Sequence, residues 1–251
     1  MIRIAAVGDL HFGADLRGTL RPHLESLPEQ ADVFLLAGDL TRVGDPDEAA
    51  VLADELRDPP IPVVAVLGNH DYHSDRQDEV GKVLEEAGVR VLEGDGAVIE
   101  ANGLRLGVAG AKGFGGGFVG ACGSDFGEPE MKAFVRHTKD VATTLEQALA
   151  ALDTDVRVAL LHYAPVEQTL QGERPEIYPF LGSYLLGEAI DRAGASLCLH
   201  GHAHRGIEKG VTPGGIPVRN VALPVIRRPY NVYCLEDGET LGIRAGGDSG
   251  G

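Results

Sequence analysis

The segment LCLHGHAHRG, residues 197–206, joins a short apolar run to three histidines at alternate positions, His200, His202 and His204. Three imidazoles this close repel one another when charged, and burying them without partners is costly. Histidine at this density favours a metal ion, although a solvated loop also fits the pattern. The same order, an apolar strand followed by metal-competent polar groups, recurs along the chain.

Four other predicted strands end in the same way. These are residues 2–8, 32–38, 62–68 and 156–163, and the polar side chains at their ends are Asp9 and His11, Asp39, Asn69, His70 and Asp71, and His162. Ligands in open α/β sheets collect outside the carboxyl ends of the strands, so the five strands indicate one shared site. Each motif alone is more typical of a turn, and only the joint pattern is specific.

The rest of the pattern predicts a mixed α/β fold. Helical periodicity covers 45–57, 75–88, 137–152 and 183–194; further strands are a hairpin over 97–110 turning at Asn102–Gly103, a run at 195–201, and a closing antiparallel pair of 216–222 with 230–236. The Gly-rich segment 110–127 predicts a long surface loop. We expect a single domain over residues 1–245 and a flexible tail over 246–251.

Composition limits the classes of partner and location. The chain has 251 residues with 38 acidic and 22 basic side chains, a net charge of −16, which argues against a nucleic-acid polymer as partner. No apolar run reaches the roughly 18 residues needed to span a bilayer, so we expect no membrane association. Cys122, Cys198 and Cys234 imply no disulfide framework, and we therefore expect a cytoplasmic location. The oligomeric state stays open.

The ordered motifs resemble those of the calcineurin-like metallophosphoesterase superfamily. They are Asp9-x-His11, Gly38-Asp39, Gly68-Asn69-His70-Asp71, His162 and Gly201-His202-x-His204, and they extend over nearly the whole chain. The resemblance implies a four-layer α/β/β/α sandwich of two facing mixed β-sheets flanked by helices. It also implies two metal ions at one edge, which share the carboxylate of Asp39. One ion would be held by Asp9, His11, Asp39 and His204, and the other by Asp39, Asn69, His162 and His202.

The implied activity is that of a dinuclear-metal phosphoesterase that hydrolyses a small phosphodiester or phosphomonoester. Mixed nitrogen and oxygen donors suit a divalent or mixed-valence pair of Mn, Fe, Zn or Co ions, among which the sequence does not choose. A hydroxide bridging the ions would attack phosphorus. By resemblance His70 assists the leaving group, and Asp71 is placed to orient His70 or serves as an ordinary turn or helix cap.

Some residues fit the family pattern less well. Many relatives carry a second aspartate three positions after the shared one, and Arg42 at that position weakens assignment to the bacterial class III cyclic-nucleotide phosphodiesterases. His200 matches no ligand position and is interpreted as a supporting or packing residue. Four residues between the ligand-bearing segments are candidate substrate contacts or structural residues: Lys112, Phe114, Arg174 and Tyr178.

Two alternative functions stay open from the sequence. The first is a non-catalytic scaffold of the same fold, but such scaffolds typically lose ligands or the acid histidine, and this chain keeps all of them. The second is a nuclease, against which the acidic composition and the lack of a basic helix or tail argue.

Overall fold

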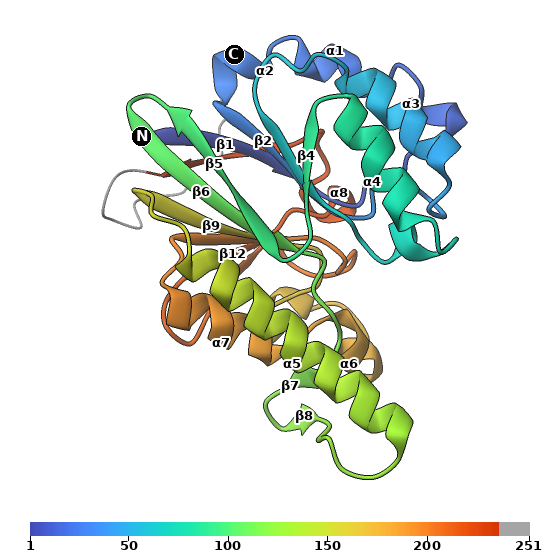
Figure 1. The fold of residues 1–251 in the computed structure, drawn as a ribbon, viewed down its shortest axis with the longest axis vertical. Helices are drawn as coiled ribbons and strands as arrows, with labels where there is room; N and C mark the ends of the chain where they lie inside the picture. The colour runs from blue at the N-terminus through green and yellow to red at the C-terminus, as the bar shows by residue number, and fades with distance from the viewer. Residues whose placement is uncertain (236–251) are drawn as a thin grey trace.

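The computed structural model describes residues 1–235, which form two facing β-sheets with helices on both outer faces (Figure 1). This is the four-layer α/β/β/α sandwich that the family resemblance implies, and the predicted fold is therefore confirmed. The predicted domain boundary at residue 245 and the predicted tail over 246–251 lie outside the described residues.

The first sheet has the strand order β13-β1-β2-β3-β4, in which only β13 runs antiparallel to its neighbour. Its strands are β1 (Ile2–Val7), β2 (Val33–Ala37), β3 (Val63–Val66), β4 (Val89–Leu92) and β13 (Asn231–Leu235). The helices on its outer face are α1 (Arg21–Leu24), α2 (Leu27–Gln30), α3 (Pro46–Leu56) and α4 (Gln77–Glu86) (Figure 1).

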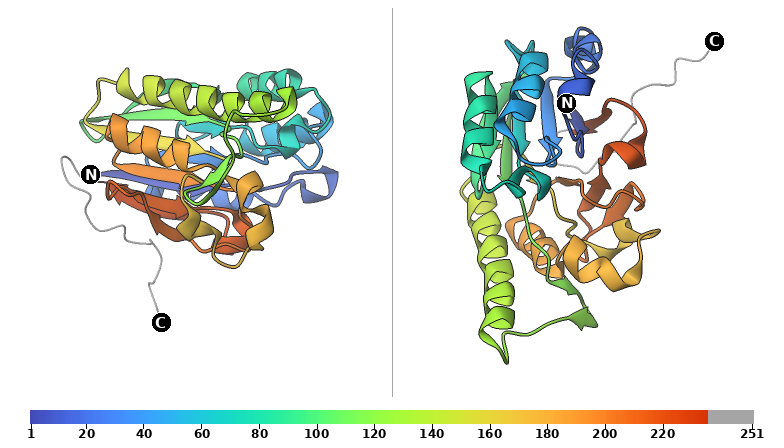
Figure 2. Two further views of the ribbon diagram at one scale, coloured as in Figure 1. Left: turned by 90° about the horizontal axis from the view of Figure 1, so that it is seen from below. Right: turned by 90° about the vertical axis from the view of Figure 1, so that its right-hand side faces the viewer.

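The second sheet has the order β11-β12-β10-β9-β6-β5. Its strands are β5 (Asp95–Ala101), β6 (Leu104–Ala111), β9 (Val156–Leu161), β10 (Leu197–His200), β11 (Lys209–Val211) and β12 (Pro217–Asn220). Its outer face is covered by α5 (Pro129–Ala150) and α7 (Tyr184–Ala193), and Figure 2 shows α5 continuing past the end of the sheet.

Short elements complete the connections between the strands. They are β7 (Gly117–Phe118), β8 (Ala121–Cys122), α6 (Tyr178–Leu181), α8 (Leu223–Ile226) and four 3₁₀ turns, η1 (Ala14–Leu16), η2 (His70–Tyr72), η3 (Glu167–Leu170) and η4 (Pro175–Ile177). In the part of the chain that the structure describes, none of the helices combines the length and apolar character that crossing a bilayer requires.

The inner strands are continuous apolar runs because each sheet is covered on both faces. Between the sheets, Ile4, Leu35 and Val158 are fully buried in one cluster that also contains Tyr233. Local signals set the helix starts: the Asp45 side chain accepts a hydrogen bond from the amide of Asp47 at 3.0 Å and caps α3. The ends of the apolar strands and the starts of the capped helices together set the bounds of the loops that connect them.

The structure corrects the predicted closing pair of strands. β12 pairs in parallel with β10 in the second sheet, whereas β13 pairs antiparallel with β1 in the first sheet. Both segments alternate like strands, but the alternation of side chains does not specify the partner strand. The two segments therefore belong to different sheets.

Other elements also differ from the sequence interpretation. The strand β4 was not predicted, and the Gly-rich segment 110–127 contains the short β7–β8 hairpin, in which Phe118 is buried. α5 begins at Pro129 rather than at residue 137, because proline suits the first turn of a helix and Glu128 precedes it in extended conformation. The hairpin turn at Asn102–Gly103 between β5 and β6 is confirmed.

The packing between the sheets predicts a large effect of truncating a central side chain. Leu35→Ala should lower the free energy of unfolding by about 2–5 kcal/mol, because the substitution leaves a cavity between two covered sheets. Urea denaturation followed by circular dichroism measures this change. Val98→Thr, at a side chain that is 46% exposed on β5, serves as the control and should change stability by less than about 0.5 kcal/mol. Equal effects of the two substitutions would contradict this description of the core.

Candidate metal centre

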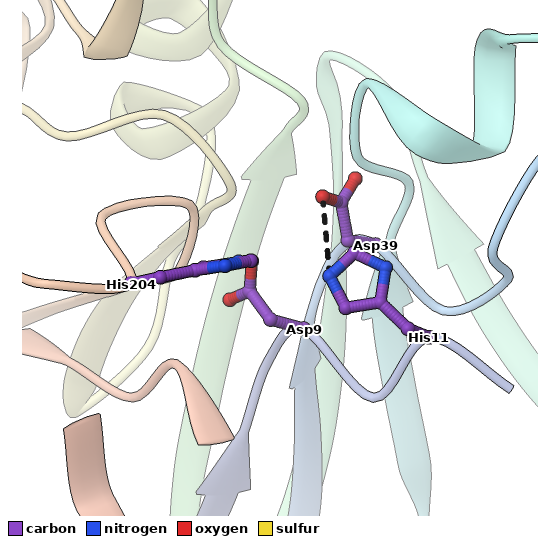
Figure 3. A group of neighbouring side chains, drawn as sticks. All are labelled: Asp9, His11, Asp39 and His204. Atoms are coloured by element: carbon purple, nitrogen blue, oxygen red, sulfur yellow. Dashed lines mark hydrogen bonds and ion pairs between the residues drawn. The ribbon is translucent and has the colours of Figure 1, made fainter. Parts of the chain in front are cut away.

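Loops from both sheets meet at one edge of the sandwich and bring two groups of potential ligands together. In each group, one ligand atom per residue lies within 4.8 Å of all the others. The first group is Asp9, His11, Asp39 and His204, and the second is Asp39, His162 and His202. Figure 3 shows the first group, in which Asp9 and His11 come from one loop and Asp39 and His204 from two others. Asp39 belongs to both groups.

Asn69 lies beside the second group. Its Oδ1 atom is 2.9 Å from Nε2 of His162, and the same nitrogen lies 3.3 Å from Oδ1 of Asp39. The structure therefore brings together all seven residues that the family resemblance assigned as ligands.

Backbone carbonyls orient two of the imidazoles. Nδ1 of His162 lies 2.9 Å from the carbonyl oxygen of Ala37, so the proton of the neutral ring is on Nδ1 and the lone pair of Nε2 is directed at Asp39 and Asn69. Nε2 of His202 lies 3.3 Å from the carbonyl oxygen of Phe180, which leaves Nδ1 as the free nitrogen of that ring. Such hydrogen bonds are typical of metal-binding histidines, because they set the tautomer.

The charge states of the Asp9 carboxylate and of the His202 ring also suit a cation. Burial alone would raise the pKa of Asp9, but the hydrogen bond from His204 at 2.7 Å and the surrounding histidines bring it below its usual value. That same hydrogen bond raises the pKa of His204. Burial lowers the pKa of His202 to about 3, so this ring is neutral at neutral pH. Ionised carboxylates and neutral imidazoles are the forms that bind metal ions.

Four of the seven residues adopt a strained backbone conformation. Their φ angles are 58° at Asp9, 46° at His11, 50° at Asp39 and 70° at His202. In the described residues, only eight non-glycine residues have positive φ, and these four account for half of them. Residues other than glycine rarely adopt a positive φ angle, and such backbone strain is concentrated at functional sites. The tight turns at the strand ends therefore position these four side chains at the site.

Two glycines provide space for carboxylates from neighbouring loops. A Cβ atom at Gly68 would overlap the backbone nitrogen and Oδ1 of Asp39, and one at Gly201 would overlap Oδ2 of Asp9. Each glycine directly precedes one ligand and contacts another. This steric requirement explains why glycine stands before Asn69 and before His202.

His70 lies at the mouth of the site as the first residue of η2. Its backbone amide donates to Oδ1 of Asp39 at 2.8 Å, and Nε2 lies 4.0 Å from Oδ2 of the same carboxylate. Nδ1 lies 2.6 Å from the carbonyl oxygen of Arg42. The ring is 45% exposed, so a substrate can reach it.

Asp71 does not orient His70, which corrects the first of the two roles considered for it. Its fully buried carboxylate accepts hydrogen bonds from the amides of Leu40, Thr41 and Gly68 and from the Thr41 hydroxyl, at 2.6–3.1 Å. These bonds tie the loop after β2 to the loop after β3. The turn-stabilising role is the one that the structure shows, and the Arg42 carbonyl takes the place of an orienting carboxylate.

Of the four candidate substrate contacts, Lys112 and Phe114 lie beside the end of β9, where Phe114 is 6.1 Å from Tyr163 between ring centroids. Lys112 follows β6, and its carbonyl accepts hydrogen bonds from the amides of His162 and Tyr163, each at 3.0 Å. The Phe114 ring packs against the ring of His137, at a centroid distance of 4.5 Å.

Tyr178 and Arg174 lie around η4 and α6. The Tyr178 hydroxyl donates to the carbonyl of Leu170 at 3.1 Å, and its ring packs on a small apolar cluster with Leu181. Arg174 precedes η4, and its carbonyl accepts a hydrogen bond from the amide of Ile177 at 3.0 Å. In the described residues these contacts stabilise the segment that carries the Phe180 carbonyl.

His200 is a buried packing residue rather than a member of either ligand group. Its Nδ1 lies 2.8 Å from the carbonyl oxygen of Gly201, and its Nε2 lies 3.0 Å from the hydroxyl of Thr169. Burial lowers the pKa of His200 to about 4, and the ring is therefore neutral.

Sequence reasoning missed the groups that hold the ligands in place. The carbonyls of Ala37, Phe180 and Arg42 leave no residue-type signal, because every residue has a carbonyl group. The ring of Tyr163, which packs on His202 at a centroid distance of 4.4 Å, could have been found, because it directly follows His162.

The family model of the calcineurin-like phosphoesterases matches residues 2–206. The chain therefore belongs to this family, which is a class of metal-dependent phosphoric ester hydrolases. A comparison with curated proteins found no match.

Solved structures share the fold at low sequence identity. The crystal structure of phosphopantetheinyl hydrolase (PptH) from Mycobacterium tuberculosis is similar with a TM-score of 0.64 and 19% identity, over 89% of this chain and 90% of that chain. A putative 5'-nucleotidase from Staphylococcus aureus is similar with a TM-score of 0.59 and 15% identity, over 97% of this chain and 53% of that chain. GAP50 of Plasmodium is similar with a TM-score of 0.51 and 12% identity, over 89% and 72%. At these identities the likeness establishes the fold alone.

The glycine geometry yields a prediction about metal binding. Gly201→Ala should reduce the amount of Mn²⁺ or Zn²⁺ that the protein retains after dialysis by at least about tenfold, because the new methyl group displaces the Asp9 carboxylate. Elemental analysis by mass spectrometry measures the retained metal. Gly81→Ala in α4, where a Cβ meets no atom within 4 Å, is the matched control and should retain the wild-type amount. Wild-type retention by Gly201→Ala would show that the site does not depend on this close approach.

Proposed function

We propose that this protein is a dinuclear-metal phosphoesterase that hydrolyses a small phosphodiester or phosphomonoester. The observation that carries the proposal is the pair of ligand groups sharing the Asp39 carboxylate. Each group combines carboxylate oxygen with two imidazole nitrogens, and Asn69 adds an amide oxygen to the second. This donor chemistry fits a pair of Mn, Fe, Zn or Co ions, divalent or of mixed valence.

The charge balance of the site supports a phosphate ester as substrate. Two divalent ions would outweigh the two carboxylates of Asp9 and Asp39, so the site would be locally positive although the net charge of the chain is −16. When bound, the two ions would supply a hydroxide nucleophile and positive charge that stabilises the phosphoryl oxygens. Proton donation to the leaving group is left to a side chain of the protein.

His70 is the residue that we assign to the leaving group. The hydrogen bond between Nδ1 and the Arg42 carbonyl fixes the orientation of the ring. Nε2 is the nitrogen on the side of Asp39. A proton on Nε2 can then be donated to the departing oxygen, and the partial exposure of the ring allows that oxygen to approach.

The two alternative functions are weaker on specific grounds. A structural neighbour described as the anchor in the inner membrane complex of Plasmodium illustrates a protein of this fold named for a structural role. In this chain, however, all seven ligand side chains and His70 lie together, an arrangement that a scaffold does not need. The net charge of −16 opposes binding of a nucleic-acid polymer, and we therefore favour a small phosphate ester over a nuclease substrate.

We retain a cytoplasmic location as part of the proposal. Within residues 1–235, Cys122, Cys198 and Cys234 are all free thiols, as expected for a reducing compartment.

A turnover assay tests the proposal. The protein supplied with Mn²⁺, Co²⁺, Ni²⁺ or Zn²⁺ should hydrolyse p-nitrophenyl phosphate or bis-p-nitrophenyl phosphate, and a chelator should abolish the activity. With phenyl phosphate, whose basic leaving oxygen needs a proton, His70→Ala should reduce kcat by about 100-fold to 10,000-fold while the protein retains its metal. Asn69→Ala should lower both the activity and the metal content, because it removes a ligand.

His73→Ala is the matched control for this assay. His73 is exposed and lies three residues after His70, so its substitution should leave kcat within about twofold of wild type. The proposal would be rejected if no metal supports turnover of either ester, and the role of His70 would be rejected if His70→Ala and His73→Ala behave alike.

A further inference from the structure

Lys112 is a cation beside the metal centre for which the proposed chemistry has no role. It directly follows β6, and its backbone is hydrogen-bonded to His162 and Tyr163 at the end of β9. Its side chain is half-buried. Burial lowers the pKa of Lys112, and this effect outweighs the attraction of the Glu93 and Asp39 carboxylates.

Three aromatic rings surround the ammonium group. Nζ lies 4.8 Å from the ring centroid of Tyr72, 5.3 Å from that of Phe114 and 5.4 Å from that of Tyr163. Each ring attracts the cation through its π face. Tyr72 belongs to the same 3₁₀ turn as His70, and Tyr163 directly follows the ligand His162. The ammonium group therefore lies against the rings of two residues, Tyr72 and Tyr163, whose chain segments carry His70 and His162.

The hydrogen-bonding capacity of this ammonium group is largely unused. Of its three protons, one is shared with the carbonyl of Gly113 at the long distance of 3.4 Å. Glu93 accepts hydrogen bonds from the Lys112 backbone amide at 3.4 Å and from the Tyr72 hydroxyl at 3.3 Å. Lys112 forms no ion pair with any carboxylate within residues 1–235. A half-buried ammonium group with free protons is a ready partner for an anion, because that anion restores the hydrogen bonds lost on burial.

From this placement we infer that Lys112 binds an anionic group on the leaving side of the substrate. The inference rests on the proposed phosphoesterase function and narrows its substrate class. The substrate is a phosphoric ester whose leaving group itself carries a carboxylate or a further phosphate, and His70 and Lys112 act on that same leaving group. Tyr72, Phe114 and Tyr163 act as positioning residues that hold the ammonium group in place.

Binding of phosphonates that cannot be hydrolysed tests this inference directly. Calorimetry with Zn²⁺-loaded protein compares phenylphosphonate with its meta- and para-carboxy derivatives. At least one carboxylated ligand should bind about tenfold more tightly than phenylphosphonate, the gain typical of one charge-assisted hydrogen bond. Lys112→Met should abolish this preference, and Lys112→Arg should restore part of it by restoring the charge. Lys82→Met, at an exposed position in α4, is the matched control and should keep the wild-type preference.

Each outcome of this experiment has a defined meaning. Equal affinities of the wild-type protein for all three ligands would overturn the inference, whether or not Lys112→Met folds. A preference that persists in a folded, metal-loaded Lys112→Met protein would also overturn it. Hydrolysis of p-nitrophenyl phosphate by the same preparation tests the proposed function separately, so turnover combined with equal affinities would reject only the role of Lys112. Failure of all three phosphonates to bind would also overturn the inference, and the turnover assay alone decides the proposed function.

Discussion

The structure depends on one buried carboxylate, that of Asp39. A carboxylate that is 1% exposed is stable only when hydrogen-bond donors or cations surround it. The amide of His70 donates to it, and His162, from the other sheet, lies 3.3 Å from it. Its backbone has a φ of 50°, and Gly68 provides the space that it occupies. The position of this group therefore constrains three loops and both sheets at once.

Each candidate ligand group combines residues from both facing sheets. The first sheet supplies both carboxylates and the amide, whereas the second supplies three of the imidazoles. Neither sheet alone holds a complete ligand group, so the site exists only when the two layers pack. Asp71 also helps to position the ligand groups, because its hydrogen bonds connect the loop that carries Asp39 to the loop that carries Asn69. Stability of the core and geometry of the site are thus coupled.

The sequence predicted that these side chains gather at one edge because they follow apolar strands, and that order is visible in a single chain. The same reasoning did not decide between the two roles considered for Asp71, because residue type and proximity to His70 do not reveal which donors surround a carboxylate. It failed for the closing strands, since β12 and β13 carry similar patterns and join different sheets. The carbonyls of Ala37, Phe180 and Arg42 orient three histidines and have no signal in residue type. The local sequence pattern specifies which segments form strands and helices, whereas the partner of a strand or of a side chain depends on tertiary packing.

The central claim is that two ions share Asp39, and anomalous X-ray diffraction from crystals of the metal-loaded protein tests it most directly. The account predicts two anomalous peaks about 3.5–4 Å apart, with the carboxylate of Asp39 between them. Asp9, His11 and His204 should surround one peak, and Asn69, His162 and His202 the other. A single peak, or two peaks of which only one contacts Asp39, would contradict it.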